Sequence, residues 1–264
     1  MKYSAIVLDL DGTLLDSNKQ VSGRNYNAVM SSHERGMKII FASARPPRAV
    51  KAFLPESFMK IGSFVYYNGA YLKCDHTGTH HHEPIDSELT AEVLDYCLRL
   101  DPDIDLSLEV LDEWMSLKEY DEDTVARVKG KPVVKTLAEL LTQTATKILI
   151  SGPTDVNVLI DRFASRLNIV VTDQGSLIQI HSIEASKEKA VARICESMGI
   201  PLDHVMVFGD DFNDIGLFEM CGMPVAMGNA VEELKAISKE IKDTNDRDGV
   251  AKTLERMIAS GGQH

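Results

Sequence analysis

Short apolar segments alternate with helix-like segments at both ends of this chain, and no other feature constrains the fold as strongly. Ile6 to Leu10 and Met37 to Ala42 are apolar runs of strand length, and each precedes a segment with helical features. The same order returns after Lys187, with an apolar run over residues 204–209. Strands that alternate with helices predict an α/β fold with a doubly wound parallel sheet, in which ligands bind at the carboxyl ends of the strands.

The middle of the chain follows a different pattern. A polar stretch from Cys74 to Pro84 leads into shorter strand-like and helix-like segments, with a predicted hairpin whose turn contains Gln174 and Gly175. We therefore expect two domains. An α/β core is formed by residues 1–82 and 183–264, and an α+β insertion occupies residues 83–182.

Charge and composition narrow the class of protein. The 264 residues include 28 Lys and Arg against 40 Asp and Glu, which gives a net charge of −12. An acidic surface repels the phosphates of nucleic acids and anionic lipids, so we expect neither as a partner. No apolar stretch approaches the ~18 residues of a membrane span, and the apolar run near the N-terminus is too short for a secretory signal. The four cysteines are widely spaced, which favours reduced thiols. We expect a cytoplasmic protein that is a monomer or a small homo-oligomer.

Two carboxylates lie at the end of the first apolar run. Asp9 and Asp11 are two positions apart, a spacing that projects both side chains to the same side of a strand. Repulsion between them raises the pKa of one, while a bound cation stabilises the other as an anion, which places a nucleophile beside a proton carrier. Gly12 allows a sharp turn. A plain turn is the alternative interpretation. A calcium loop is excluded because a third ligand before the glycine is missing.

A second acidic cluster follows the apolar run at residues 204–209. It contains Asp210, Asn213 and Asp214. Alone, this cluster could be a helix N-cap, where Asp and Asn are favoured. Beside the first pair of carboxylates, it offers the further oxygen ligands that Mg²⁺ prefers.

Two single residues complete the candidate site. Ser43 follows the second apolar run and precedes Ala44, and a hydroxyl with backbone N–H groups at a helix entrance suits a phosphate oxygen. A simple helix cap is the alternative for Ser43. Lys187 begins a predicted helix; a surface lysine is the plain interpretation, and Lys189 competes for any role.

Together, these segments resemble the four signature motifs of the haloacid dehalogenase superfamily. In chain order, the motifs are DxDGT at Asp9 to Thr13, a hydroxyl at Ser43, a lysine at Lys187, and GDxxND at Gly209 to Asp214. The spacing is similar to that of the Cof-type branch, which carries a cap domain of the C2B type between the second and third motifs. The Asn68-Gly69 turn and the stretch from Asn245 to Val250 also fit this branch.

The resemblance implies a Rossmann-like core, a C2B cap over residues 83–182 that governs specificity, and an Mg²⁺-dependent phosphatase. Its substrates would be small phosphomonoesters. Sugar phosphates are expected first, and nucleotide or cofactor phosphates such as flavin mononucleotide or pyridoxal phosphate next. Family members often have glycine after the second-motif hydroxyl, where this chain has Ala44. Alanine keeps the N–H group, so we expect phosphate binding to survive.

The resemblance also implies roles for individual residues. Asp9 would attack phosphorus and form an aspartyl-phosphate, and Asp11 would act as acid and base. Mg²⁺ would be held by Asp9, by Asp210 and by either the backbone carbonyl or the carboxylate of Asp11. Asp214 would hold water molecules bound to the ion, and whether Asp214 also contacts the ion directly is left open. Thr13 would stabilise the loop. The phosphoryl oxygens would be held by Leu10, Ser43, Ala44, Lys187 and Asn213.

Two other activities use the same motifs. A phosphosugar mutase forms the same aspartyl-phosphate but returns the phosphoryl group to the sugar. A non-catalytic sensor of phosphate ligands is the second alternative. A sensor predicts that the nucleophile or the acid has been lost, whereas Asp9 and Asp11 are both present.

A histidine-rich segment permits one further alternative. Cys74, His76 and the three consecutive histidines at positions 80–82 include residue types that bind zinc. Consecutive histidines rarely converge on one tetrahedral ion, however. We therefore interpret the segment as a solvated hinge that leads into the insertion.

Overall fold

A computed structural model describes residues 3–152, 155–172 and 175–260 of the chain. These residues form two compact units, each described here by itself. The core unit contains Met1–Arg45, Phe53–His81 and Lys187–His264, and the inserted unit contains Pro46–Ala52 and His82–Ser186.

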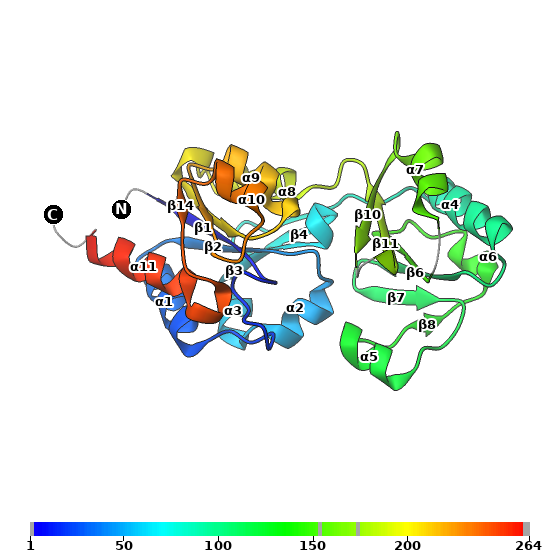
Figure 1. The fold of residues 1–264 in the computed structure, drawn as a ribbon, viewed down its shortest axis with the longest axis horizontal. Coiled ribbons are helices and arrows are strands. Elements are labelled where there is room, and N and C mark those ends of the chain that lie inside the picture. Colours follow the sequence, from blue (N-terminus) through cyan, green and yellow to red (C-terminus); the bar gives the residue numbers. More distant parts are fainter. Residues whose placement is uncertain (1–2, 153–154, 173–174, 261–264) are drawn as a thin grey trace. The chain divides into compact units, whose positions relative to one another are not determined.

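An eight-stranded sheet lies at the centre of the core unit (Figure 1), in the order β14-β13-β12-β1-β2-β3-β4-β5. Neighbouring strands from β14 to β3 are parallel, and β4 is antiparallel to β3. The expected doubly wound, Rossmann-like parallel sheet is confirmed. The strands are β1 (Ala5–Asp9), β2 (Lys38–Ala42), β3 (Gly62–Tyr66), β4 (Tyr71–Cys74), β5 (Thr79–His82), β12 (Val205–Gly209), β13 (Met223–Ala226) and β14 (Glu240–Ile241).

Helices lie on both faces of this sheet (Figure 1). Alternate residues of β1 and β2, such as Val7 and Ile40, join an apolar cluster with α8, α9 and α10. On the opposite face, Phe41 stacks on Phe58 of α3, which stacks on Tyr26 of α1. The helices of the core unit are α1 (Gly23–Glu34), α3 (Glu56–Ile61), α8 (Lys187–Ser197), α9 (Ile215–Met220), α10 (Glu232–Ile237) and α11 (Gly249–Ser260); α2 spans Pro47–Phe53.

The inserted unit contains a six-stranded sheet in the order β10-β11-β9-β6-β7-β8, with β7 and β8 parallel. One face packs on helices through Leu94, Leu140 and Phe163. The strands are β6 (Asp105–Val110), β7 (Glu113–Ser116), β8 (Val133–Val134), β9 (Lys147–Ser151), β10 (Leu167–Thr172) and β11 (Leu177–Ser182). The helices are α4 (Ser87–Leu100), α5 (Glu122–Val128), α6 (Leu137–Leu140) and α7 (Val156–Phe163).

The structure differs from the sequence-based expectation in the segment after Tyr71. Cys74, the last residue of β4, and all of β5 lie in the region in which a solvated hinge was expected. Leu72 and Cys74 of β4 are buried because they alternate with Tyr71 and Lys73 along the strand. Further along the chain, both strands of the predicted hairpin are present, while Gln174 lies outside the described residues.

Two short segments outside residues 83–182 group with the inserted unit. Pro46–Ala52 groups with the inserted unit, where Arg48 donates two hydrogen bonds to the carboxylate of Glu109. Residues 183–186 group with the inserted unit as well.

Two further observations concern the cysteines and the helices. All four cysteines are free and buried. Within the part of the chain that the structure describes, no helix is both long enough and apolar enough to cross a lipid bilayer.

Candidate active site

Three carboxylates meet at one edge of the core sheet. Asp9 is the last residue of β1, and Asp210 directly follows the last residue of the neighbouring parallel strand β12. Parallel neighbours end at the same edge of a sheet, so both side chains emerge there. Asp214 lies one helical turn beyond Asp210. Oxygen atoms of these three residues lie within 4.8 Å of one another.

One ammonium group lies between two of these carboxylates. Lys187 is the first residue of α8 and is 1% exposed. Its Nζ donates to Asp9 Oδ1 at 2.6 Å and to Asp214 Oδ1 at 2.8 Å. Burial alone would lower the pKa of Lys187, but the charges of Asp214 and Asp9 outweigh it and raise the pKa above its usual range. Lys187 therefore remains a cation. Lys189, the competing lysine, is exposed.

Burial, together with repulsion from neighbouring carboxylates, raises the pKa of two residues of this cluster. Burial raises the pKa of Asp9 well above its usual value; Lys187 opposes the rise, and Asp214 and Asp210 add to it. Burial likewise raises the pKa of Asp210 to about 7. A buried cluster of three carboxylates and one ammonium group has unbalanced negative charge, which a cation bound there would relieve.

Asp214 uses both oxygens within the protein. Oδ1 accepts from Lys187, and Oδ2 accepts from the backbone N–H groups of Asp210 and Asp211 at 3.0 and 3.3 Å. The side chain of Asp214 is 0% exposed. Asp214 thus holds the loop that carries Asp210, and its oxygens are already satisfied.

Asp9 and Asp210 each have an oxygen with spare capacity. Among the residues that the structure describes, none donates a hydrogen bond to Asp9 Oδ2. Asp210 Oδ1 accepts from the Thr13 hydroxyl at 2.8 Å, while Oδ2 has a long contact of 3.4 Å with the Asn229 amide. Carboxylate oxygens of this kind are the ligands that a hard divalent cation prefers, so the donor set fits Mg²⁺.

The turn after Asp11 fits closely against Asp210. Gly12 has a φ of +78°, and a Cβ atom there would lie 2.1 Å from Asp210 Oδ2. Asn229 donates to the Gly12 carbonyl oxygen at 2.8 Å. Only glycine satisfies both the backbone angle and the space at this position.

Asp11 is not one of the three residues of the acidic cluster. Arg45 donates to its two oxygens at 2.5 and 2.8 Å, and Lys19 Nζ lies 2.7 Å from Oδ1. Burial would raise the pKa of Asp11, but the hydrogen bonds and charges of Arg45 and Lys19 outweigh it and lower the pKa. In this arrangement Asp11 is a carboxylate, a state suited to accept a proton.

The residues predicted to bind phosphate lie on the segments that follow the strands. Ser43 comes directly after β2 and is 2% exposed, and its Oγ accepts from the Arg45 N–H at 3.1 Å. Within the described part of the chain, no acceptor takes the hydroxyl hydrogen of Ser43, which can therefore be donated to a ligand. Asn213 is exposed and donates to Asn68 Oδ1 at 3.0 Å. Two backbone positions complete this set: Leu10, which directly follows Asp9 and is buried, and Ala44, which is half-buried.

The stretch near the C-terminus fastens the loop that follows Asp11. Asn245 donates to the Leu15 carbonyl oxygen at 2.9 Å. Asp246 accepts from the backbone N–H and the hydroxyl of Ser17 at 2.7 and 2.6 Å. The similarity of this stretch to the Cof-type branch was the only signal in the sequence for these contacts.

The sequence analysis did not identify Arg45, Lys19 or Asn229 as site residues. Each of these three residues contacts a residue that is distant in the sequence or separated from it by a turn. No local sequence pattern therefore identifies them. For Arg45, one signal was available: it is a charged residue two positions after Ser43, at the end of a strand that leads to the site.

Two histidines of the histidine-rich segment contact different parts of the chain. His76 Nε2 lies 3.0 Å from the Ile61 carbonyl oxygen, and His82 Nε2 lies 2.8 Å from Thr146 Oγ1. These side chains therefore have separate partners. Within the described residues, the only group of His, Cys, Asp and Glu that could hold an ion is the acidic cluster.

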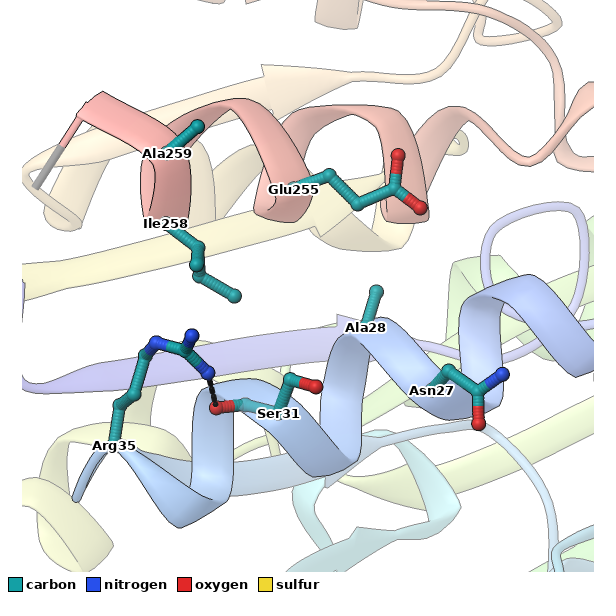
Figure 2. A pocket seen from close by; sticks show the side chains of 7 residues that line it. All are labelled: Asn27, Ala28, Ser31, Arg35, Glu255, Ile258 and Ala259. Atoms are coloured by element: carbon teal, nitrogen blue, oxygen red, sulfur yellow. Dashed lines mark hydrogen bonds between the residues drawn. The ribbon is translucent and has the colours of Figure 1, made fainter. Parts of the chain in front are cut away.

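A surface pocket of about 260 Å³ lies between α1 and α11 (Figure 2). It shares no residue with the acidic cluster. Figure 2 shows the Arg35 side chain bonded back to the Ser31 carbonyl oxygen of its own helix. The lining residues are Asn27, Ala28, Ser31, Arg35, Glu255, Ile258 and Ala259.

The chain matches the family model of haloacid dehalogenase-like hydrolases over residues 6–254. The chain belongs to this family. The resemblance that its four motifs suggested is therefore confirmed.

Curated relatives cover nearly the whole chain. The 5-amino-6-(5-phospho-D-ribitylamino)uracil phosphatase YitU of Bacillus subtilis is 25% identical over 265 residues, which are 96% of this chain and 97% of that protein. The phosphatase YwpJ of the same organism is 26% identical over 300 residues, and the match covers 96% of this chain and 99% of that protein. These relatives confirm the predicted enzyme class, a phosphoric monoester hydrolase of this superfamily.

Solved structures agree with this family. A Thermotoga maritima protein is similar with a TM-score of 0.87 and 27% identity, over 96% of this chain and 97% of the other. A haloacid dehalogenase-like hydrolase from Bacteroides thetaiotaomicron gives a TM-score of 0.84 and 27% identity, over 97% of this chain and 99% of the other.

Proposed function

We propose that this protein is an Mg²⁺-dependent phosphatase that hydrolyses small phosphomonoesters through an aspartyl-phosphate on Asp9. One observation carries the proposal. Asp9 is buried at the end of β1 with one oxygen held by Lys187 and the other without a protein donor among the described residues. An oriented carboxylate oxygen of this kind can attack phosphorus, while Lys187 offsets the charge of a dianionic substrate.

Asp9, Asp210 and Asp11 would hold the Mg²⁺ ion. Asp9 and Asp210 contribute carboxylate oxygens, and Asp11 contributes its backbone carbonyl because its carboxylate is engaged by Arg45 and Lys19. When bound, the ion supplies positive charge that offsets the charge of the phosphoryl group. Asp214 would hold the waters of the ion and the Asp210 loop, and Thr13 would keep Asp210 in place.

Asp9 and Asp11 would divide the chemistry between them. Asp11, an anion beside Arg45 and Lys19 in the free protein, would first take up a proton from solvent. Asp9 Oδ2 then forms a bond to phosphorus as the bond from phosphorus to the leaving oxygen breaks; that oxygen takes the electron pair and receives the proton of Asp11. A water molecule then gives a proton to Asp11 and bonds to phosphorus, and the Asp9–phosphorus bond breaks to release inorganic phosphate. The phosphoryl oxygens are held by Leu10, Ser43, Ala44, Lys187 and Asn213.

The inserted unit would act as a C2B cap that selects the substrate, with the boundaries expected at residues 83–182. We propose sugar phosphates as the first substrate class and flavin mononucleotide, pyridoxal phosphate or nucleotides as the next. The name of one relative supports a small phosphorylated metabolite, since that protein acts on a phospho-D-ribitylamino-uracil. We propose a cytoplasmic enzyme, a monomer or small homo-oligomer without nucleic acid or membrane partners, in keeping with its acidic charge and free thiols.

Phosphate release from p-nitrophenyl phosphate tests the proposal. We expect release with Mg²⁺, none with a chelator, and none from the Asp9→Asn variant with Mg²⁺. An exposed aspartate far along the chain, Asp203, supplies the control substitution Asp203→Asn, which keeps full activity. A folded wild-type protein that binds Mg²⁺ but releases no phosphate would contradict the proposal. A stable phosphoenzyme that loses phosphate to water slowly but to a sugar quickly would instead identify a mutase.

A further inference from the structure

Arg45 makes a two-bond fork with Asp11. Its Nε donates to Asp11 Oδ2 at 2.5 Å and its Nη2 donates to Oδ1 at 2.8 Å. Each carboxylate oxygen has its own N–H donor, so the two bonds together fix both the place of the carboxyl group and its rotation. None of the roles proposed above uses Arg45.

Arg45 is itself held on several sides. Its backbone N–H donates to Ser43 Oγ at 3.1 Å, and its backbone oxygen accepts from the Tyr67 N–H at 3.2 Å. Its guanidinium group lies over the ring of Phe53, 4.6 Å from the ring centre. These contacts hold Arg45 in place, so its guanidinium group can set the orientation of the Asp11 carboxyl group.

Asp11 has little other support. Its side chain is 36% exposed. Lys19 adds a third donor at 2.7 Å, from a side chain that is 44% exposed. An ammonium group on a flexible stem attracts a carboxylate without setting its orientation. The orientation of Asp11 therefore depends on the fork from Arg45.

We propose that Arg45 is a positioning residue that orients the Asp11 carboxyl group for proton transfer. The proposal rests on the proposed function, in which Asp11 gives its proton to the leaving oxygen as the phosphorus–oxygen bond breaks. Proton transfer in a transition state depends strongly on the orientation of the acid. Loss of the fork will therefore slow the reactions that need a proton from Asp11 and largely spare those that do not.

Two aryl phosphates of similar shape separate these cases. p-Nitrophenolate leaves readily without a proton, whereas phenolate depends more on one. We compare kcat/KM for p-nitrophenyl phosphate and phenyl phosphate, with Mg²⁺, in the wild type, Arg45→Gln and Arg45→Lys. This ratio reports the first chemical step, in which the leaving group departs, so the later attack of water does not enter.

Both substitutions are expected to lower kcat/KM for phenyl phosphate about 10-fold more than for p-nitrophenyl phosphate. Arg45→Lys behaves like Arg45→Gln, because lysine keeps the charge but not the fork. The matched control is Arg24→Gln. Arg24 makes the same kind of fork with Glu255, at 2.9 and 2.6 Å on the surface of the core unit, and its loss leaves both substrates unaffected.

Three outcomes would overturn the proposal. Equal losses on both substrates would mean that Arg45 binds the phosphoryl group or supports the fold. Full recovery in Arg45→Lys would mean that charge alone matters. A wild-type protein inactive on both esters would instead refute the function on which the proposal rests. Circular dichroism confirms that each variant is folded, and Arg45→Lys, which retains a cation near Phe53, carries the test if Arg45→Gln does not fold.

Discussion

The ammonium group of Lys187 lies 2.6 Å from Asp9 Oδ1, although 178 positions separate the two residues in the chain. Lys187 begins α8 and Asp9 ends β1, so the contact joins two motifs that the sequence places at opposite sides of the insertion. It also makes a buried ion pair the centre of the candidate site.

Removal of the Lys187 charge is expected to destabilise the core unit. Lys187→Met leaves Asp9 and Asp214 buried without their cation, which costs about 3 kcal/mol in the free energy of unfolding. Chemical denaturation followed by circular dichroism measures this change. The comparison variant is Lys189→Met on the exposed side of the same helix, for which the change stays within about 0.5 kcal/mol. Equal stabilities of the two variants would contradict the ion-pair geometry.

Thermal stabilisation by Mg²⁺ should depend on Asp210 and not on the carboxylate of Asp11. Asp210 belongs to the acidic cluster, whereas the Asp11 carboxylate is bonded to Arg45. We expect saturating Mg²⁺, at about 100 times its Kd, to stabilise the wild type and Asp11→Asn by about 2.7 kcal/mol, and Asp210→Asn hardly at all. Differential scanning calorimetry with and without a chelator measures the effect. Loss of stabilisation in Asp11→Asn would place the metal elsewhere.

Gly12→Ala should be more damaging than an alanine at another glycine with a positive φ. Both Gly12 and Gly36 lie in the left-handed region, with φ of +78° and +89°. At Gly36 a Cβ would meet nothing within 4 Å, whereas at Gly12 it would lie 2.1 Å from Asp210 Oδ2. Gly36→Ala costs about 1 kcal/mol for the backbone angle alone.

For Gly12→Ala we expect a further loss of about 1 to 3 kcal/mol and the loss of Mg²⁺ binding, because Asp210 must move. Urea denaturation and a metal titration measure the two effects. If the two alanine variants were equally stable and both bound Mg²⁺, the close approach of Gly12 to Asp210 would be wrong.

The inserted unit should lose stability in acid because of His181. This imidazole is 3% exposed, and its Nε2 has no hydrogen-bond partner among the residues that the structure describes. Burial, followed by the charge of Lys147, lowers its pKa to about 3. Below pH 6.5 the unfolded chain binds a proton at His181 that the folded unit does not, so stability falls as the pH falls. Between pH 6.5 and 5 this loss is about 2 kcal/mol.

Trp114 is the single tryptophan of the chain and lies in β7, so its fluorescence reports unfolding of the inserted unit. We expect the dependence on pH to be largely absent in His181→Gln and unchanged in His204→Gln, whose histidine is exposed. The same pH dependence in all three proteins would show that another group titrates.

Local patterns in the sequence were sufficient to predict much of the core. The apolar runs ending at Asp9 and Gly209 predicted two parallel strands with acidic residues at their carboxyl ends, and the structure brings both ends to one edge. Such runs depend on burial of neighbouring side chains, which is encoded position by position. Strand β5 was not predicted, because its three consecutive histidines interrupt the alternation of polar and apolar residues. Strand β4 was not predicted either, although its residues do alternate.

By itself, the sequence determined the family, the α/β class and the positions of the four motifs, because each depends on residue types at short spacing. Only the tertiary structure decided which charges meet. It paired Asp11 with Arg45 and Lys19 and placed Asp214, rather than Asp11, beside Lys187 and Asp9. Such pairings depend on which strands lie side by side and on how each turn directs its side chains. Local sequence patterns contain no information about contacts between residues that are far apart in the chain.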